Sequence, residues 1–205
     1  MPVETDKPDS PQVLRTKAQL KSAFLQLRRK KSIAQINIHE ITALAQINRT
    51  SFYRYYFDVY DLQQDVLDDF IAQFQQILSA IFQKLLTQGN ISMQEMPLQF
   101  LLEHQDILQI LLHDPDSIAH LKQEQKIFVK QFLQIPPDDA RADYALEFLI
   151  SGQLGIISYW IQHQDTLSLE NLFALIKEML LSQGPLAILL KLAPESLREN
   201  AKIQV

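Results

Sequence analysis

Apolar residues recur every three or four positions through most of this chain, the spacing that places side chains on one face of an α-helix. An early segment shows this spacing at four positions, Leu20, Ala23, Phe24 and Leu27. A longer apolar series begins at Val59 and predicts one helix of about 28 residues, 59–86, that ends near Gly89.

Prolines divide the second half of the chain into further helical segments. They mark boundaries at Asp114-Pro115, Pro136-Pro137 and Gly184-Pro185. One helix begins near Pro97, and the segments that follow it are 118–133, 138–163 and 167–182. With a short helix after residue 185, the pattern predicts an all-α protein of nine to ten helices.

Two short helices are predicted between residues 37 and 56. Asn37 is a good N-cap, and Glu40 three residues later completes a capping-box sequence. The segment 46–48 is typical of a turn, and Asn48 caps a second helix that extends over about 49–56. Two short helices joined by a three-residue turn are the plan of a helix-turn-helix, a DNA-reading motif.

The second of these helices carries side chains suited to nucleic acid. Hydroxyls donate to phosphates or contact base edges, and arginine makes bidentate hydrogen bonds with guanine. Phe52 lies between polar neighbours, as expected of a residue that anchors the helix to the body. The predicted DNA contacts, flanking contacts with the phosphate backbone included, are Lys17 or Lys21, Asn37, His39, Arg49, Thr50, Ser51, Tyr53, Arg54 and Tyr55.

Aromatic residues crowd around the end of this helix. Five of them fall within eight positions, namely Tyr53, Tyr55, Tyr56, Phe57 and Tyr60. A helix so short cannot bury all of them, so we expect some to be exposed, and exposed aromatic side chains indicate a partner. The alternative is a surface helix that is simply rich in aromatic residues.

Charge is unevenly distributed along the chain. Residues 1–60 hold 10 Lys and Arg against 5 Asp and Glu, a net charge of +5, whereas residues 61–205 hold 9 against 19, a net charge of −10. A basic N-terminal segment followed by an acidic remainder predicts that the N-terminal segment binds a polyanion. Such segregation also arises by chance.

Composition excludes several classes of site. The 205 residues contain no Cys, which rules out disulfides, thiol nucleophiles and cysteine-ligated metals, and the 4 Gly form no phosphate-binding fingerprint. No run of 18 residues is free of charged or strongly polar side chains, and the N-terminus lacks a leader pattern. We therefore expect a cytoplasmic protein without a membrane span.

An enzyme is a competing hypothesis. The five histidines form no HExxH motif and no i, i+4 pair, so neither a metal site nor a cofactor is predicted. His113 and His120 flank Asp114 and Asp116, but acids that cap a helix end explain this spacing better than metal ligation. A second alternative is a helical adaptor or co-regulator that acts through protein partners without strong DNA binding.

The segment INIHEITALAQINRTSFYRYYFDVYDL resembles the DNA-binding domain of the TetR family of bacterial transcriptional regulators. The matching positions are Ile36, Ile41, Ala45, Ile47, Ser51, Phe52, Tyr53, Tyr55, Tyr56, Asp58 and Leu62. Three positions depart from the family pattern: the turn glycine is Gln46, an alanine is Thr42, and a phosphate-binding lysine is Val59. Tyr60 is a candidate to replace that lysine.

The resemblance implies a transcriptional repressor, relieved by a small molecule, that binds a palindromic operator as a homodimer. Residues 12–58 would form the three-helix DNA-binding domain, and residues 59–205 the helical domain for ligand binding and dimerisation. The segment YALEFLISGQLGIISYWIQHQ is also similar to Gram-positive members of the family, including regulators of the dihydroxyacetone kinase type.

The predicted helix 138–163 carries two apolar stripes, one more than a monomer needs. Gly152 and Gly155 are unfavourable inside a helix unless another helix approaches closely there. With the next helix, this indicates a four-helix-bundle dimer interface formed by Leu146, Ile150, Leu154, Ile157, Ile161, Leu172, Ile176 and Met179. The alternative is that the second stripe packs under the apolar tail 186–193.

An effector pocket is predicted between the long helix and the helices that face it. Pockets between bundle helices commonly hold small molecules, and the few charges nearby favour an apolar or weakly polar effector. The predicted lining residues are Phe70, Phe74, Ile77, Phe100, Leu101, Leu108, Phe128 and Phe132. Plain core packing would also account for each of them.

Overall fold

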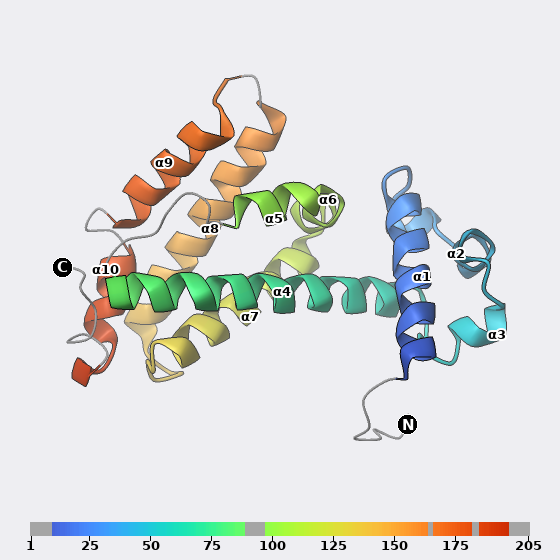
Figure 1. Cartoon of the computed structure of the whole chain (residues 1–205), viewed down its shortest axis with the longest axis horizontal. Coiled ribbons are helices and arrows are strands. Elements are labelled where there is room, and N and C mark those ends of the chain that lie inside the picture. The colour runs from blue at the N-terminus through green and yellow to red at the C-terminus, as the bar shows by residue number, and fades with distance from the viewer. Residues whose placement is uncertain (1–9, 89–96, 164–165, 182–184, 197–205) are drawn as a thin grey trace. The chain divides into compact units, whose positions relative to one another are not determined.

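The structure is a computed structural model that describes residues 10–88, 97–163, 166–181 and 185–196. These residues form ten α-helices and one short 3₁₀ helix, with no strand among them (Figure 1). The all-α prediction is confirmed. Within the same ranges, no helix is both long enough and apolar enough to cross a membrane.

The first helices follow the capping signals of the sequence. Helix α1 spans Pro11–Arg28, where the Ser10 hydroxyl accepts from the Val13 N–H at 3.4 Å and proline occupies the first turn. A 3₁₀ helix, η1, covers Ile33–Gln35, and α2 covers Ile38–Ala45. The long helix α4, Val59–Gln88, confirms the predicted 59–86 to within two residues.

Helix α3 is shorter than predicted. It spans Arg49–Phe52, a single turn, whereas the sequence predicted a helix to about Tyr56. The next three residues form a turn in which the Tyr55 and Tyr56 N–H groups both donate to the Phe52 carbonyl. No glycine or proline marks this end in the sequence, and the Tyr56 hydroxyl donates there to Asp65 of α4.

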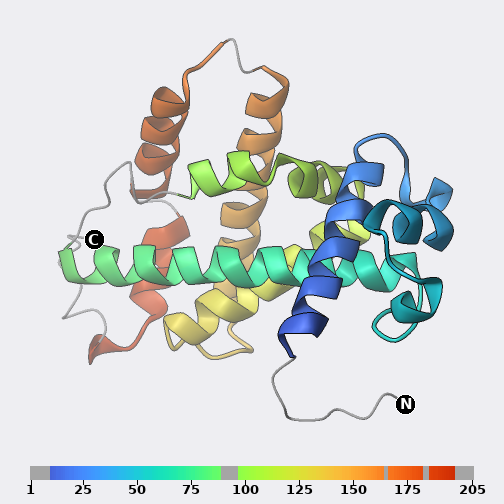
Figure 2. The ribbon, with the colours of Figure 1, turned by 45° about the vertical axis from the view of Figure 1, so that its right-hand side comes forward.

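The second half of the chain contains six more helices within the described ranges. They are α5 Leu98–Glu103, α6 Gln105–His113, α7 Pro115–Phe132, α8 Ala140–Gln162, α9 Leu169–Leu181 and α10 Pro185–Leu192. The predicted single helix after Pro97 is divided into α5 and α6 at His104. Figure 2 shows α8 and α9 as neighbours that run in opposite directions.

The chain divides into two compact units, Met1–Phe70 and Ile71–Val205. The division falls inside α4, so the first unit includes Val59–Phe70, which the sequence prediction assigned to the second domain. This segment adds four acids and no base, giving residues 1–70 a balance of 10 Lys and Arg against 9 Asp and Glu. The first unit is therefore close to neutral as a whole.

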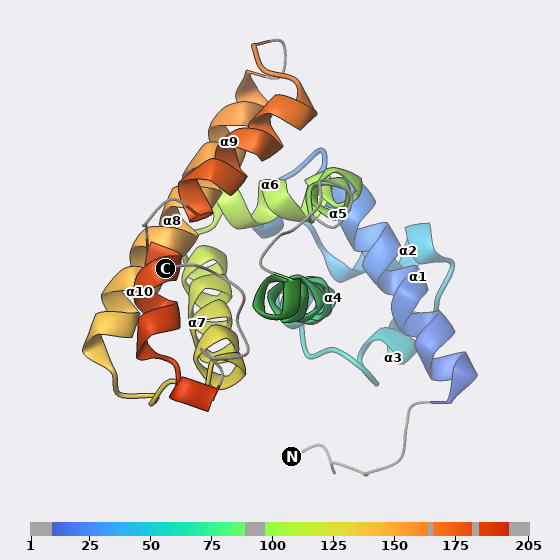
Figure 3. The same ribbon diagram turned by 60° about the vertical axis from the view of Figure 1, so that its left-hand side comes forward.

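The core of the second unit joins α7, α8, α10 and the last turns of α4. Its largest fully buried side chains are Leu85 of α4, Leu133 directly after α7, Leu146 of α8 and Leu189 of α10. Figure 3 shows α10 lying beside α8 and α7. The apolar tail that the sequence placed after residue 185 is thus one wall of this core.

Ion pairs join the surfaces of α7 and α8 beside this core. Lys122 and Lys126 donate to the two oxygens of Glu147 at 2.8 and 2.7 Å, and the Ser151 hydroxyl adds a third hydrogen bond at 2.9 Å. Lys130 pairs with Asp143 at 2.7 Å in the same way. The hydrogen bonds from Lys122, Lys126 and Ser151 lower the pKa of Glu147 to about 2.

We predict that Glu147→Gln lowers the free energy of unfolding at pH 7 by about 1 kcal/mol, because a half-exposed pair is screened by solvent. A carboxyl whose pKa falls on folding stabilises the protein above its unfolded pKa of 4.5 and loses this effect as the pH falls toward 2. Denaturant unfolding measured from pH 7 to pH 2 should therefore show the two proteins converging in acid. A constant difference across that range would contradict the assignment.

Candidate functional site

The helix-turn-helix begins with a capping box at the start of α2. The Asn37 side chain accepts from the Glu40 N–H at 3.0 Å, and the Glu40 carboxylate accepts from the Asn37 N–H at 3.3 Å. Lys31 also pairs with Glu40, and the hydrogen bond from Lys31 lowers the pKa of that carboxyl. Asn37 and His39 are both exposed, so the predicted flanking contacts lie on the surface.

The turn between α2 and α3 depends on Gln46 in a left-handed conformation. Its φ is 56° and its ψ is 40°, a region that favours glycine because a Cβ crowds the following carbonyl. The Gln46 and Ile47 N–H groups donate to carbonyls of the last turn of α2. Gln46 thus adopts the conformation that a glycine would adopt at this position of the family pattern, and whether its side chain strains the turn stays a prediction.

Helix α3 presents Arg49 and Tyr53 together at its surface. Asn48 caps the helix by accepting from the Thr50 N–H at 2.9 Å, as predicted. The Arg49 guanidinium donates to the Tyr53 hydroxyl at 3.1 Å and lies 5.6 Å from the centre of the Tyr53 ring. Both side chains are exposed, so they form one preassembled polar and aromatic pair.

A surface hollow brings several of the predicted contacts together. It has a volume of about 480 Å³ and is lined by η1 and by the first residues of α2, α3 and α4. Three of the predicted DNA contacts, Asn37, His39 and Arg49, share its wall with Tyr60. Tyr60 directly follows Val59, the position of the phosphate-binding lysine in the family pattern, and its side chain is exposed. Its replacement of that lysine stays a prediction.

The crowded aromatic residues divide into buried and exposed groups. Phe52 is fully buried, which confirms its predicted anchoring role, and Tyr56 is also buried. Tyr53, Tyr60 and Phe57 are exposed, and Phe57 has 84% of its surface accessible. The backbone of Phe57 is held by a hydrogen bond to Asp61 at 2.8 Å, so the exposed ring projects from a fixed position.

A polar cluster that the sequence did not predict lies beneath this surface. The Tyr56 hydroxyl donates to the Asp65 carboxylate at 2.6 Å, and Lys21 pairs with the same oxygen at 2.9 Å and with Asp69 at 2.5 Å. No local pattern in the sequence indicates this role of Asp65. Lys21 is an optional phosphate contact in the sequence prediction, but in the structure this lysine is engaged with α4.

Other predicted contacts occupy accessible positions on the same unit. Thr50 and Arg54 are exposed, and Ser51, Tyr55 and Lys17 are partly buried. Lys17 lies near enough to Asp65 to contribute to the low pKa of that carboxyl. The assignment of these residues to DNA stays a prediction.

The His113–His120 segment is occupied by helix-end contacts. His113 Nδ1 lies 2.8 Å from the Gln109 carbonyl, and the Ser117 hydroxyl donates to Asp114 at the start of α7. Among the described residues, no three His, Asp or Glu side chains gather as metal ligands would.

The predicted effector pocket is largely packed. Phe74 stacks on Phe100 with ring centres 6.2 Å apart, and Phe128 and Phe132 pack against Phe82. Ile77 packs on the core of the second unit, whereas Phe70 is a buried residue of the first unit. These contacts are those of core side chains.

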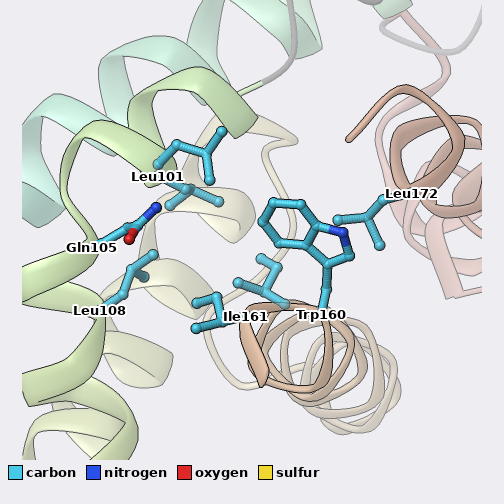
Figure 4. Close-up of a pocket in the computed structure, with 8 residues that line it drawn as sticks. Leu101, Gln105, Leu108, Trp160, Ile161 and Leu172 are labelled. Carbon is cyan, nitrogen blue, oxygen red and sulfur yellow. The ribbon is translucent and has the colours of Figure 1, made fainter. Parts of the chain in front are cut away.

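A small cavity lies beside the remaining two predicted pocket residues. Leu101 and Leu108 line it on one side, and Trp160, Ile161 and Leu172 line it on the other (Figure 4). Ile157 is also among its lining residues. Its volume is about 10 Å³, which holds at most one water molecule. Trp160 is fixed by a 2.8 Å hydrogen bond from its Nε1 to the Leu167 carbonyl. An effector site here would require side chains to move, and it stays a prediction.

The predicted dimer stripe on α8 mostly faces the interior of its own chain. Leu146 is fully buried and Ile150 nearly so, and both pack in the core that contains α10. Leu154 packs on the same core, and Ile157 and Ile161 line the small cavity. For Leu146 and Ile150, the alternative to a dimer interface is correct, because these residues pack under the apolar tail of their own chain. Leu172 and Ile176 of α9 are likewise buried, and only Met179 is exposed.

An exposed stripe also runs along the whole of α8 with a spacing of three and four residues, and it consists of Tyr144, Phe148, Gly152, Gly155 and Tyr159. It shares Phe148, Gly152 and Tyr159 with the other stripe that the sequence predicts, in which Ala145 is buried. Phe148 has 71% of its surface accessible. A Cβ added at either glycine would meet no atom within 4 Å. Packing within one chain therefore does not require these glycines.

No family sequence model matches this chain, and no curated protein sequence matches it. Solved structures match its fold. The TetR transcriptional regulator from Streptococcus agalactiae 2603V has 19% sequence identity and a TM-score of 0.54, over 80% of this chain and 95% of that protein. A TetR-family transcriptional regulator from Streptomyces coelicolor has 19% identity and a TM-score of 0.51, over 90% and 95%.

The dihydroxyacetone kinase operon activator DhaS matches in the same way. It has 17% sequence identity and a TM-score of 0.55, over 87% of this chain and 98% of DhaS. These likenesses cover the helical body as well as the helix-turn-helix. The chain therefore has the fold of TetR-family regulators, as the resemblance of 36–62 predicted.

We predict that Gln46→Gly raises the free energy of unfolding by about 0.5–1 kcal/mol, because glycine adopts the left-handed conformation without crowding its carbonyl. Denaturant unfolding measures the change. The matched control is Gln19→Gly, at an exposed position in the middle of α1, which should lower stability by about 1 kcal/mol. Equal losses in both variants would show that Gln46 is not strained.

Proposed function

We propose that this chain is a DNA-binding transcriptional regulator rather than an enzyme. The observation that carries the proposal is the convergence of Asn37, His39, Arg49 and Tyr60 around one exposed hollow of a helix-turn-helix. Amide, imidazole, guanidinium and phenol groups are donors to phosphate oxygens and base edges. The fold of TetR-family regulators supports the same function.

The first unit would bind DNA through individual side chains held at fixed positions rather than through a large net positive charge. Its bases and acids nearly balance, but the acids Asp65 and Asp69 are paired with Lys21. Arg49, His39 and Asn37 lie around the hollow instead. We therefore expect the dependence of affinity on salt to correspond to a few phosphate contacts per half-site.

A single helix-turn-helix covers one half-site, so specific recognition would need two copies. We propose that the exposed α8 stripe, Tyr144 to Tyr159, forms a two-fold interface together with Leu175 and Met179 of α9. The two glycines leave room for a second helix to approach closely. Each lowers helix stability by up to about 1 kcal/mol relative to alanine, and a partner helix would offset this.

We propose repression as the sign of regulation. A dimer seated on promoter DNA excludes polymerase without any additional contact, whereas activation, the activity named for DhaS, needs a further surface. We further propose that an apolar effector would open the helical body at the small apolar cavity beside Trp160. As a DNA-binding regulator, the protein would act in the cytoplasm.

We predict that the double substitution Arg49→Ala, Tyr53→Ala weakens binding to the operator at least tenfold, since each lost base or phosphate contact is worth about 1–3 kcal/mol. The operator is the duplex that the unmodified chain enriches from random DNA, and fluorescence anisotropy gives the Kd. The matched control is Arg141→Ala, which removes an exposed arginine from α8 and should leave the Kd unchanged.

Unchanged binding by the double variant would refute the assignment of these residues. Failure of the unmodified chain to enrich or bind any duplex, at two salt concentrations, would refute the regulator itself. A dimer that binds no DNA would then favour the helical adaptor, because its exposed surfaces would serve protein partners instead.

We predict that Phe148→Glu converts the dimer into a folded monomer, because the charge would be buried against its two-fold mate while the protomer core is untouched. Sedimentation at micromolar protein measures the mass, and circular dichroism confirms the fold. Gln131→Glu, an exposed position on α7, adds the same charge outside the stripe and should leave the dimer intact. A dimer that survives Phe148→Glu would exclude this interface.

A further inference from the structure

The position of α3 cannot be maintained by the helix itself. It has four residues, and a single turn fixes several dihedral angles for very few hydrogen bonds. Its orientation therefore depends on anchors at its two ends. Asn48 caps the first end, and the buried rings of Phe52 and Tyr56, with centres 5.6 Å apart, support the other.

The second anchor is tied to two other helices through one hydroxyl. Tyr56 is 3% exposed, and its hydroxyl donates to Asp65 Oδ2 of α4 at 2.6 Å. Lys21 of α1 donates to that oxygen at 2.9 Å, to the Asp65 carbonyl at 3.3 Å and to Asp69 at 2.5 Å. The Lys21 side chain is only 16% exposed. We call these residues the Tyr56–Asp65–Lys21 cluster.

Tyr56 and Asp65 have opposite pKa shifts in this cluster. Burial raises the pKa of Tyr56, and its hydrogen bond to Asp65 raises it further, so Tyr56 is a donor at any physiological pH. Burial also raises the pKa of Asp65, but hydrogen bonds from Tyr56 and Lys21 outweigh this and leave it lowered. A neutral hydroxyl thus donates to a carboxylate, which is a strong class of hydrogen bond.

The packing of the ring at position 56 does not by itself require a hydroxyl that donates to Asp65. A phenylalanine at position 56 would fill the same space against Phe52 without the hydrogen bond. The hydroxyl adds direction, because it fixes the distance between the turn after α3 and the second turn of α4. Arg49 and Tyr53 lie on the turn of helix that Phe52 and Tyr56 support.

We propose that the Tyr56–Asp65–Lys21 cluster positions α3, so that Arg49 and Tyr53 meet the operator in one register. Tyr56 is a positioning residue and touches no DNA itself. The inference rests on the proposed function. It follows that losing the hydroxyl reduces discrimination between the operator and other DNA, while general attraction to DNA is unaffected.

The experiment compares the unmodified chain with Tyr56→Phe on two duplexes. One is the operator enriched by the unmodified chain, and the other has the same composition in scrambled order. We expect the Kd for the operator to rise about fivefold or more, as for loss of one hydrogen bond to a charged group. The Kd for the scrambled duplex should change by less than a factor of two.

Two further variants separate positioning from other effects. Asp65→Asn should reproduce the loss of discrimination, and adding Tyr56→Phe to it should have little further effect, because both act on one hydrogen bond. Asp68→Asn is the charge control, since it removes an equal charge from the same helix and should alter both duplexes alike. All Kd values are measured at least 20 °C below each variant's thermal midpoint, so that the folded protein is compared.

Each outcome has one meaning. Equal Kd changes for both duplexes, or no change for either, would overturn the positioning role even if Tyr56→Phe lowers the thermal midpoint. Absence of discrimination by the unmodified chain would refute the proposed function and this inference together, and it would be seen before any substitution is made.

Discussion

A helix of four residues cannot hold its own shape in water, and the candidate DNA-reading surface is built on one. Everything that α3 presents therefore depends on hydrogen bonds and packing supplied from outside it. Asn48 fixes one end, and the buried rings of Phe52 and Tyr56, which pack against each other at a tilt, fix the other. The long helix α4 matters to this site because it supplies Asp65, the acceptor that Tyr56 needs.

The features of the site that the sequence predicted are those made by hydrogen bonds between near neighbours. Asn37 and Asn48 cap their helices as expected, by accepting from the N–H groups of Glu40 and Thr50. Each of these bonds spans two or three residues, so its signal lies within a few letters. The link from Tyr56 to Asp65 spans nine residues, and that from Lys21 spans 44, so no local pattern indicates them.

Contacts between residues far apart in the sequence also decide which apolar stripe of α8 is buried, and the sequence gives no local pattern for them. Leu146 and Phe148 are equally apolar, and the sequence places them on different stripes of one helix. Which stripe is buried depends on where α10 packs, about 40 residues later in the chain, and α10 covers Leu146. Leu146 is 0% exposed and Phe148 is 71% exposed, so the structure distinguishes stripes that hydrophobicity could not.

The balance of charges in the first unit affects how that unit would recognise a particular DNA sequence. The first 60 residues are basic, but the compact unit also contains the acids at the start of α4, and its charges nearly balance. A nearly neutral unit gains little from non-specific attraction to phosphates. Its binding energy must then come from side chains held in register with particular groups on the duplex, and such contacts weaken rapidly when the helix that carries them shifts. A unit of this kind depends on rigid placement of α3 more than a strongly basic one would, and the buried polar contacts of Tyr56, Asp65 and Lys21 provide that placement.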